Sequence, residues 1–428
     1  MMHRQKLNRQ AQRRGALVLI ITTSAIIAPM GLPAAWAAPA SAPAGAAQPT
    51  TNPVPVPNPV PNPAPTVNPK AAMPVPGAPV LSARSYVLLD ANTGQIIVQK
   101  NADQPVPPAS ITKLMTSYLV FSALKSGDIH MNDMVTISKN AWQMQGSKMF
   151  IEVGKQVSVE NLLRGMIVQS GNDAATALAE YVGGNQESFV AQMNATAKKL
   201  GMINTHYEDP TGWPADGHVM SARDISLLFN DLVRKFPDYY HEFFRQKEFT
   251  WNGIKQINRE KLLFRDNWID GGKTGHTEEA GFCLATSGQQ NGMRLIAVVL
   301  GTDSDDARNN EAEALMNYGF RFFENVPVRK ADEVLATPAL FKGAESSVPA
   351  GLAQDLVVLV PKDQAKNVIV SMTINPKLIA PLAQNQAVGK LTVKLGDKVI
   401  AERDVVALKA VPEGGFFKKM IDSVRLWF

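Results

Sequence analysis

The sequence predicts an α/β domain, followed by a small all-β domain and a C-terminal amphipathic helix. Three observations support this fold class. Segments with helical and with strand-like hydrophobic spacing are mixed over residues 83–330. Short strands rich in Val and Leu then follow one another over residues 331–411. Finally, bulky apolar residues in the segment 412–428 recur at the spacing of a single helical face.

The N-terminal segment has the pattern of a secretory signal peptide. Basic residues between Arg4 and Arg14 precede an apolar run over 16–28, and Ala35-Trp36-Ala37 fits a small-residue cleavage site. A retained membrane anchor is the alternative, but the run is shorter than the roughly twenty apolar residues that a spanning helix needs. We therefore expect an exported protein that loses residues 1–37. Cleavage also removes the basic surplus behind the formal net charge of +5, so no nucleic-acid partner is predicted.

Residues 38–82 are rich in Pro and Ala and nearly free of charge, which predicts an extended linker without a core. The predicted catalytic domain, 83–330, begins with a hairpin and places Ser110 at the start of a helix and Lys273 on an edge strand. Its expected strands are 86–90, 94–99, 281–287 and 294–300, its expected helices begin at 110 and cover 159–166, 173–182 and 311–323, and 270–272 reads as a turn.

The two C-terminal segments carry no evident chemistry. The β domain, 331–411, is interpreted as a spacer, with a protein-docking platform as the alternative. In the last segment, Phe416, Phe417, Met420 and Val424 fall on one helical face and basic residues on the other, a pattern typical of a helix lying in a membrane surface. Docking of this helix onto its own protein is the alternative.

Three short motifs suggest a serine acyl-transfer site: Ser110-Ile111-Thr112-Lys113, Ser170-Gly171-Asn172 and Lys273-Thr274-Gly275. Residues three apart on a helix share a face, so the amine of Lys113 can reach the hydroxyl of Ser110. A lysine can act as a general base only when burial and a nearby cation lower its pKa, and Lys273 is the expected second cation. Ser170 is predicted to relay a proton to the leaving amine, and Asn172 to orient Lys113 and the substrate.

The third motif is predicted to bind substrate. Lys273 and Thr274 offer a cation and a hydroxyl to a carboxylate, and Gly275 lets a substrate backbone approach closely. The backbone N–H groups of Ser110 and His276 are the expected oxyanion donors, while an acid/base role for the His276 side chain is the alternative. No histidine has a partner at metal-ligand spacing, so neither a metal nor another cofactor is predicted.

These motifs and their neighbours resemble the low-molecular-mass penicillin-binding proteins that act as D-alanyl-D-alanine carboxypeptidases. The resemblance extends to Leu89-Asp90-Ala91-Asn92-Thr93-Gly94, Asp209-Pro210-Thr211-Gly212-Trp213-Pro214, the β domain and the amphipathic tail, and covers the chain from about residue 83 to its end. It implies the serine β-lactamase/penicillin-binding-protein fold, an antiparallel sheet between helical layers. It also implies that two arginines, matched here to Arg259 and Arg308, assist Lys273 in holding the substrate carboxylate.

The resemblance predicts a serine carboxypeptidase that releases the terminal D-alanine of peptidoglycan stem peptides and is trapped by β-lactam antibiotics. The enzyme is expected at the periplasmic face of the bacterial inner membrane. Gly171 replaces the Asp of the β-lactamase motif, and residues 209–224 contain no evident glutamate to activate a deacylating water, which argues against efficient antibiotic hydrolysis. A D,D-endopeptidase of cross-links and a catalytically weak wall-binding morphogenetic protein are the alternatives.

Overall fold

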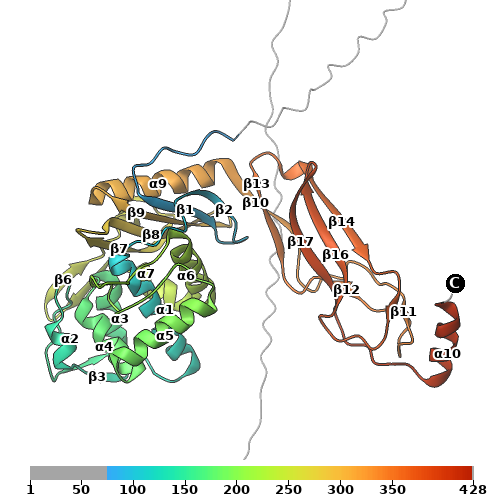
Figure 1. Cartoon of the computed structure of the whole chain (residues 1–428), viewed down its shortest axis with the longest axis horizontal. Coiled ribbons are helices and arrows are strands. Elements are labelled where there is room, and N and C mark those ends of the chain that lie inside the picture. The colour runs from blue at the N-terminus through green and yellow to red at the C-terminus, as the bar shows by residue number, and fades with distance from the viewer. Residues whose placement is uncertain (1–74, 427–428) are drawn as a thin grey trace, which may run out of the picture. The chain divides into compact units, whose positions relative to one another are not determined.

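The computed structural model describes residues 75–426. The predicted signal peptide, most of the predicted linker and the last two residues of the tail lie outside this range. Within it, a five-stranded antiparallel sheet with the order β2-β1-β9-β8-β7 is the centre of the first domain (Figure 1). Its strands are β1 (Ser85–Asp90), β2 (Ile96–Lys100), β7 (Ile269–Thr277), β8 (Gly281–Gln290) and β9 (Met293–Thr302).

Both faces of this sheet are covered. Successive residues of a strand point to opposite faces, so one strand contributes side chains to two separate buried clusters. In β1, Val87 and Leu89 belong to one buried cluster, and Tyr86 and Leu88 to the other. The long helix α9 packs on one face, and the short helix α8 contributes to the same buried cluster. Helices α1 to α7 contribute to the cluster on the other face, where α6 packs on the sheet (Figure 1). The helices are α1 (Lys113–Ser126), α2 (Lys139–Gln143), α3 (Val159–Val168), α4 (Asn172–Gly183), α5 (Gln186–Lys199), α6 (Ala222–Lys235), α7 (Pro237–Phe244), α8 (Leu262–Arg265) and α9 (Asp305–Phe322).

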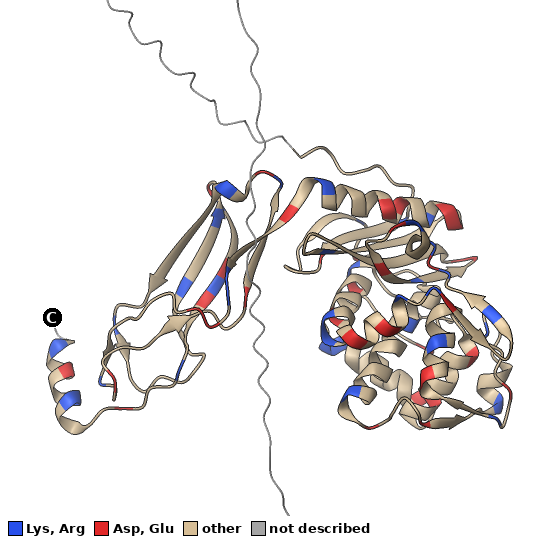
Figure 2. Ribbon diagram, turned by 180° about the vertical axis from the view of Figure 1, so that it is seen from behind, with Lys and Arg blue, Asp and Glu red and all other residues tan. Residues whose placement is uncertain are grey.

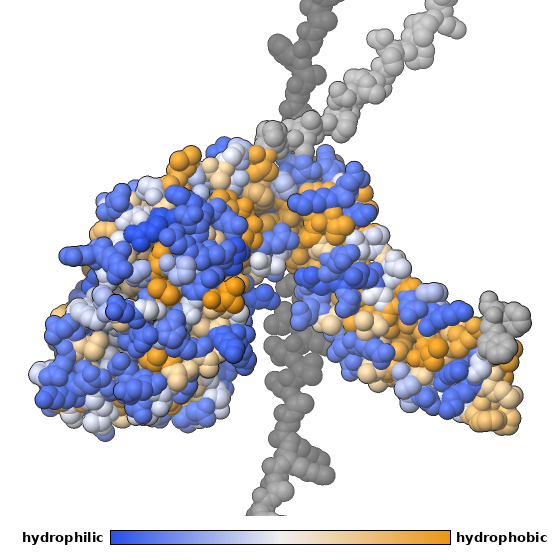
Figure 3. Space-filling model, in the orientation of Figure 1, coloured by the Kyte–Doolittle hydropathy of each residue, from blue (hydrophilic) through white to orange (hydrophobic). Residues whose placement is uncertain are grey.

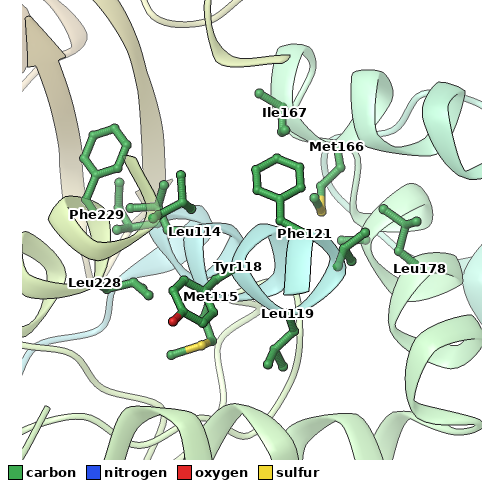
Figure 4. Packing of buried hydrophobic residues seen from close by; sticks show 14 of the residues in the cluster. Leu114, Met115, Tyr118, Leu119, Phe121, Met166, Ile167, Leu178, Leu228 and Phe229 are labelled. Carbon is green, nitrogen blue, oxygen red and sulfur yellow. The ribbon is translucent and has the colours of Figure 1, made fainter. Parts of the chain in front are cut away.

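Helix α1 runs through the larger cluster. Its buried side chains, among them Leu114, Tyr118 and Phe121, contact residues of α3, α4 and α6 (Figure 4). Because α1 is buried on nearly all sides, its first turn is held in place by packing rather than by local propensity alone. Two small hairpins complete the domain: β3 (Met134–Thr136) with β4 (Gln156–Ser158), and β5 (Glu248–Trp251) with β6 (Ile254–Ile257).

Two local expectations are wrong. The glycine pair after Asp270 forms no turn but belongs to β7, with a bulge in the ladder between Ile269 and Gly271. Glycine is needed at 272 because a Cβ there would lie 2.7 Å from the carbonyl oxygen of Ala285 on β8, and 2.6 Å from Glu260 Oε2. Helix α9 begins at Asp305 instead of 311, since Ser304 caps it by accepting a hydrogen bond from Ala307 N. The first turns of α9 are mostly polar and lack the apolar spacing from which the helix was predicted.

The all-β part begins with β10 (Phe323–Arg329), which continues directly from α9 and pairs with β13 (Leu356–Pro361). A four-stranded sheet of order β12-β17-β16-β14 shares its core with β13 and with the loops between the strands. The remaining elements are β11 (Leu340–Phe341), β12 (Ala350–Gly351), β14 (Val368–Ile374), β15 (Leu378–Ile379), β16 (Ala387–Leu395), β17 (Lys398–Ala407) and α10 (Phe416–Arg425).

Candidate active site

Ser110 lies in a 3₁₀ turn, Ala109–Thr112, that leads directly into α1. Side chains three residues apart eclipse one another in such a turn, which brings Ser110 and Lys113 together. The amine Nζ of Lys113 donates a hydrogen bond to Ser110 Oγ at 2.8 Å. Ala109, just before the serine, has a left-handed backbone with φ of 48°, a strained conformation typical of functional sites.

Two further acceptors fix the amine of Lys113. Nζ donates to Asn172 Oδ1 at 2.7 Å and to the carbonyl oxygen of Thr211 at 2.7 Å. The side chain has no exposed surface. As an ammonium group, Lys113 donates to all three oxygens. In the uncharged amine the two N–H groups stay on Asn172 Oδ1 and the Thr211 carbonyl, which can only accept, so the lone pair faces the serine hydroxyl.

Burial lowers the pKa of Lys113 to about 7, against the opposing effect of the Asp209 and Asp173 carboxylates. Arg259 is a nearby cation that also lowers the pKa of Lys113. Burial and the mutual repulsion with Lys113 hold the pKa of Lys273, the second cation expected from the sequence, well below its ordinary value. A substantial fraction of Lys113 is thus uncharged at neutral pH, as a general base requires.

The second motif stands between the two lysines. Ser170 has a left-handed backbone with φ of 66°, and its Oγ accepts a hydrogen bond from Lys273 Nζ at 2.9 Å. Lys273 Nζ also donates to the carbonyl oxygen of Thr274 at 2.9 Å. Lys273 and Thr274 lie on β7, which is an edge strand as expected. The free edge of β7 offers unpaired backbone groups to an extended peptide.

Asn172 opens helix α4, and its side chain joins two segments. Its Oδ1 accepts from Lys113, while its Nδ2 donates to the carbonyl oxygen of Gln145 at 2.7 Å. Gly171 stands where the β-lactamase motif has Asp, and the structure gives a steric reason for it. A Cβ at this position would lie 2.8 Å from Asp173 Oδ1 and 3.1 Å from Met149 N. Asp173 itself holds the 149–151 backbone, accepting from Met149 N at 2.9 Å.

A cavity of about 930 Å³ opens over these residues. It is lined by Ser110, Ser170, Thr274, Gly275, His276, Arg259 and Arg308, among others. The structure thus brings both arginines into the cavity that holds the serine. Arg308 NH1 donates to the carbonyl oxygen of Gly275 at 3.0 Å, and Arg259 Nε donates to that of Gln169 at 3.1 Å. The ring of His276 stacks on Phe282 with centroids 4.0 Å apart.

Sequence reasoning gave no role to several charged residues of the site. The carboxyl group of Glu260 is buried behind β7, and burial raises its pKa to about 8. Asp209 and His218 form a buried pair beside α1. The only signal in the sequence was the Asp-Pro-Thr-Gly run of the 209–212 segment, which is typical of a side-chain-stabilised turn.

Comparison with known proteins gives consistent matches over both domains. Residues 72–304 match the family described as D-alanyl-D-alanine carboxypeptidase, and residues 323–413 match the penicillin-binding protein 5 C-terminal domain. The D-alanyl-D-alanine carboxypeptidase DacC of Escherichia coli strain K12 is 44% identical over 359 residues, covering 82% of this chain and 90% of that protein.

Two crystal structures illustrate the range of the similarity. Penicillin-binding protein 5 from Haemophilus influenzae has a TM-score of 0.76 and 39% identity, covering 79% of this chain and 99% of that one. Penicillin-binding protein D2 from Listeria monocytogenes, in its ampicillin-bound form, has a TM-score of 0.53 and 30% identity, covering 57% of this chain and 100% of that one.

Proposed function

Because the chain belongs to the D-alanyl-D-alanine carboxypeptidase family, we propose that it releases the terminal D-alanine of peptidoglycan stem peptides through an acyl-enzyme on Ser110. One observation carries this proposal: the buried amine of Lys113, with a pKa lowered to about 7, lies 2.8 Å from Ser110 Oγ. This is the geometry of an activated nucleophile with its base.

Acylation begins when Lys113 takes the proton of the Ser110 hydroxyl as Oγ attacks the carbonyl carbon of the peptide bond. The negative charge that develops on the carbonyl oxygen faces the backbone N–H groups of Ser110 and His276. Ser170, hydrogen-bonded to Lys273, passes a proton to the leaving amine and is reprotonated by the proton that Lys113 took from Ser110, so D-alanine departs and Lys113 is again uncharged. Water then hydrolyses the ester on Ser110 and restores the free hydroxyl.

The cationic side of the cavity selects a free terminal carboxylate. Arg259, Arg308 and Thr274 line the space next to the serine. Lys273 is buried and acts from behind this lining, through its hydrogen bond to Ser170 Oγ. Arginine suits this task because its planar fork of donors matches a carboxylate. A peptide whose carboxyl end is amidated or extended would lose these charge-assisted hydrogen bonds.

The same site is proposed to be acylated by β-lactams, since a β-lactam presents a reactive amide next to a carboxylate. The ampicillin-bound relative supports this. The leaving group of a β-lactam stays attached to the acyl chain, so it blocks the approach of water and the acyl-enzyme persists.

The test is D-alanine release from a stem pentapeptide, with Ser110→Ala as the control. Release by the wild type and none by the variant support the carboxypeptidase. An endopeptidase would instead consume cross-linked muropeptides while leaving the pentapeptide intact. A wall-binding protein would bind peptidoglycan without releasing D-alanine.

We also propose that the enzyme acts outside the cytoplasm, held to the membrane surface by α10. Phe416, Phe417, Met420, Ile421 and Val424 are each more than half exposed, although a soluble helix normally buries its apolar face. Apolar surface gathers at this helix (Figure 3), which also carries basic residues, Lys418, Lys419 and Arg425 (Figure 2). Among residues 75–426, no helix has the length and apolar character needed to cross a bilayer. Lying in the interface is the mode that such a helix suits.

Replacing Phe416, Phe417 and Met420 by serine tests this second proposal. Binding to anionic lipid vesicles should fall sharply while D-alanine release in solution is retained. The matched control is Ile369→Ser, which removes another exposed apolar side chain, 57% exposed, from β14. Equal vesicle binding by the triple variant and the wild type would refute the anchoring role of α10.

A further inference from the structure

Lys113 is held by a segment outside the three motifs, the turn 209–213. The carbonyl oxygen of Thr211 accepts from Lys113 Nζ at 2.7 Å, which is as short as the contact with Asn172. The neighbouring carbonyl of Pro210 accepts from Thr116 Oγ1, also on α1, at 2.6 Å. The position of this turn therefore decides where the amine of Lys113 lies.

The side chain of Asp209 shapes the turn. Its Oδ1 accepts from Thr211 N and from Thr211 Oγ1, each at 2.6 Å, and from Gly212 N at 2.9 Å. Such bonds from a carboxylate to its own following backbone define an Asx turn. Gly212 continues the turn with φ of 80°, and its Cα lies so close to the Ala109 carbonyl oxygen that a Cβ would overlap it. The turn thus lies directly against the 3₁₀ turn that carries Ser110.

His218 fastens the other oxygen of Asp209 to α1. One ring nitrogen, Nδ1, lies 3.1 Å from Asp209 Oδ2, and the other, Nε2, lies 2.9 Å from Thr112 Oγ1. The side chain of His218 is 2% exposed and that of Asp209 is 13% exposed. These contacts form a loop that begins and ends next to the general base. Thr112, which bonds to His218, directly precedes Lys113 in the sequence, and the turn that His218 and Asp209 hold in place contacts Lys113 through the Thr211 carbonyl.

We propose that Asp209 and His218 form a positioning pair for the general base, holding the Thr211 carbonyl where it keeps the amine of Lys113 over Ser110. Neither side chain lines the cavity over the serine, so they act through Lys113 and not on the substrate. The inference rests on the proposed function, because it assigns a task to residues behind the same site.

The charge of Asp209 gives the pair a second effect. Burial alone would raise the pKa of Asp209, but hydrogen bonds from His218 and Thr211 lower it to about 2, so the carboxylate stays ionised. The charged groups that act on Lys113 are Asp209 and Asp173, which raise its pKa, and Arg259, which lowers it; Lys273 is coupled to it as well. Removing the charge of Asp209 must therefore lower the pKa of Lys113 further.

The test uses Asp209→Asn and His218→Ala in the full-length protein, with acylation by a fluorescent penicillin measured from pH 5 to pH 9. Asp209→Asn keeps the acceptor oxygen for the turn, removes the charge and places an NH2 group opposite His218 Nδ1. Because the charge is lost, the acid limb of the rate profile should move to lower pH. His218→Ala should lower the plateau rate by about 10-fold to 100-fold, the effect expected of a misplaced catalytic group. His218→Gln, whose amide can both donate and accept, should recover part of this loss.

His206→Ala is the matched control, because His206 also pairs with an acid, Glu208 at 2.9 Å, but is 54% exposed and does not contact α1. Thermal unfolding checks that each variant is folded. An unmoved acid limb in Asp209→Asn, together with a plateau within about twofold of the wild type in folded His218→Gln and His218→Ala, would overturn the positioning role. The proposed function fails by a different result, namely the absence of Ser110-dependent D-alanine release from the wild type.

Discussion

Lys113 makes a quantitative prediction for the pH dependence of acylation. Only the uncharged amine can accept the proton of Ser110, so the rate should follow the fraction of Lys113 that is deprotonated. Burial sets the pKa of this amine at about 7, compared with 10.5 for an unperturbed lysine. The fraction of free base is then about 0.9 at pH 8 and about 0.01 at pH 5. Acylation should therefore slow by about 90-fold over this range, with a midpoint near pH 7.

The assay is the second-order rate constant for labelling by a fluorescent penicillin at pH values from 5 to 9, under conditions where the rate is proportional to penicillin concentration. Lys113→Met should abolish labelling at every pH. Lys125→Met is the control, because Lys125 lies on the same helix but is exposed and donates only to the Lys235 carbonyl. A rate that is flat from pH 5 to pH 8 in folded protein, or a midpoint near pH 4 to 5, would mean that another group, such as a carboxylate, is the base.

Three further predictions concern neighbouring groups. Arg259→Gln should raise KM for a peptide with a free terminal carboxylate by about 10-fold, and should move the acid limb of acylation to higher pH, since Arg259 lowers the pKa of Lys113; an unchanged limb would contradict that coupling. Gly212→Ala should abolish acylation because its Cβ would overlap the Ala109 carbonyl, whereas Gly217→Ala, which has a similar φ of 83° but its nearest neighbour at 3.5 Å, should cost stability alone; equal activity of the two would refute the steric argument. Burial raises the pKa of Glu260 from the 4.5 of an unperturbed glutamate to about 8, so the fold retains a proton that the unfolded chain releases, and stability falls as pH rises from 4.5 to 8. The melting temperature of Glu260→Gln should lack this pH-dependent loss, and a melting temperature that changes equally with pH in variant and wild type from pH 5 to pH 8 would rule it out.

Local patterns in the sequence predicted the first motif because its geometry is local. Ser110 and Lys113 are three residues apart, so any helical turn brings them together. The continuous apolar runs of β1 and β9 likewise predicted two strands, and both are buried in the sheet. The three motifs could be assigned to one site only through the family resemblance. Their contacts, such as Lys273 with Ser170 across 103 residues, follow from the tertiary fold and not from spacing.

The missed features share one physical cause. The bond between His218 and Thr112 spans 106 residues, and neither residue type is unusual in its own segment. Likewise, nothing in the sequence near Glu260 indicates that its carboxyl will be buried behind Gly272. The turn expected after Asp270 was wrong because two glycines are compatible with either a turn or a strand under close approach. Only the neighbours in space, Glu260 and the β8 backbone, decide between them.

The same burial that makes Lys113 a base is a cost to folding. A shift from 10.5 to about 7 means that this group makes the fold about 5 kcal/mol less stable at neutral pH and below than above pH 10.5, where the amine is uncharged in both states. This is a large share of the 5–15 kcal/mol by which a typical domain is stable. The apolar side chains of α3, α4 and α6 that surround α1 create this cost, because they exclude the water that would solvate the ammonium group (Figure 4). Burial of the same apolar side chains also stabilises the fold, which offsets the cost. Catalytic strength and stability are therefore coupled through one helix. A substitution that admits water beside Lys113 would relieve the desolvation, but it would also return the amine towards the charged state, in which it cannot activate Ser110.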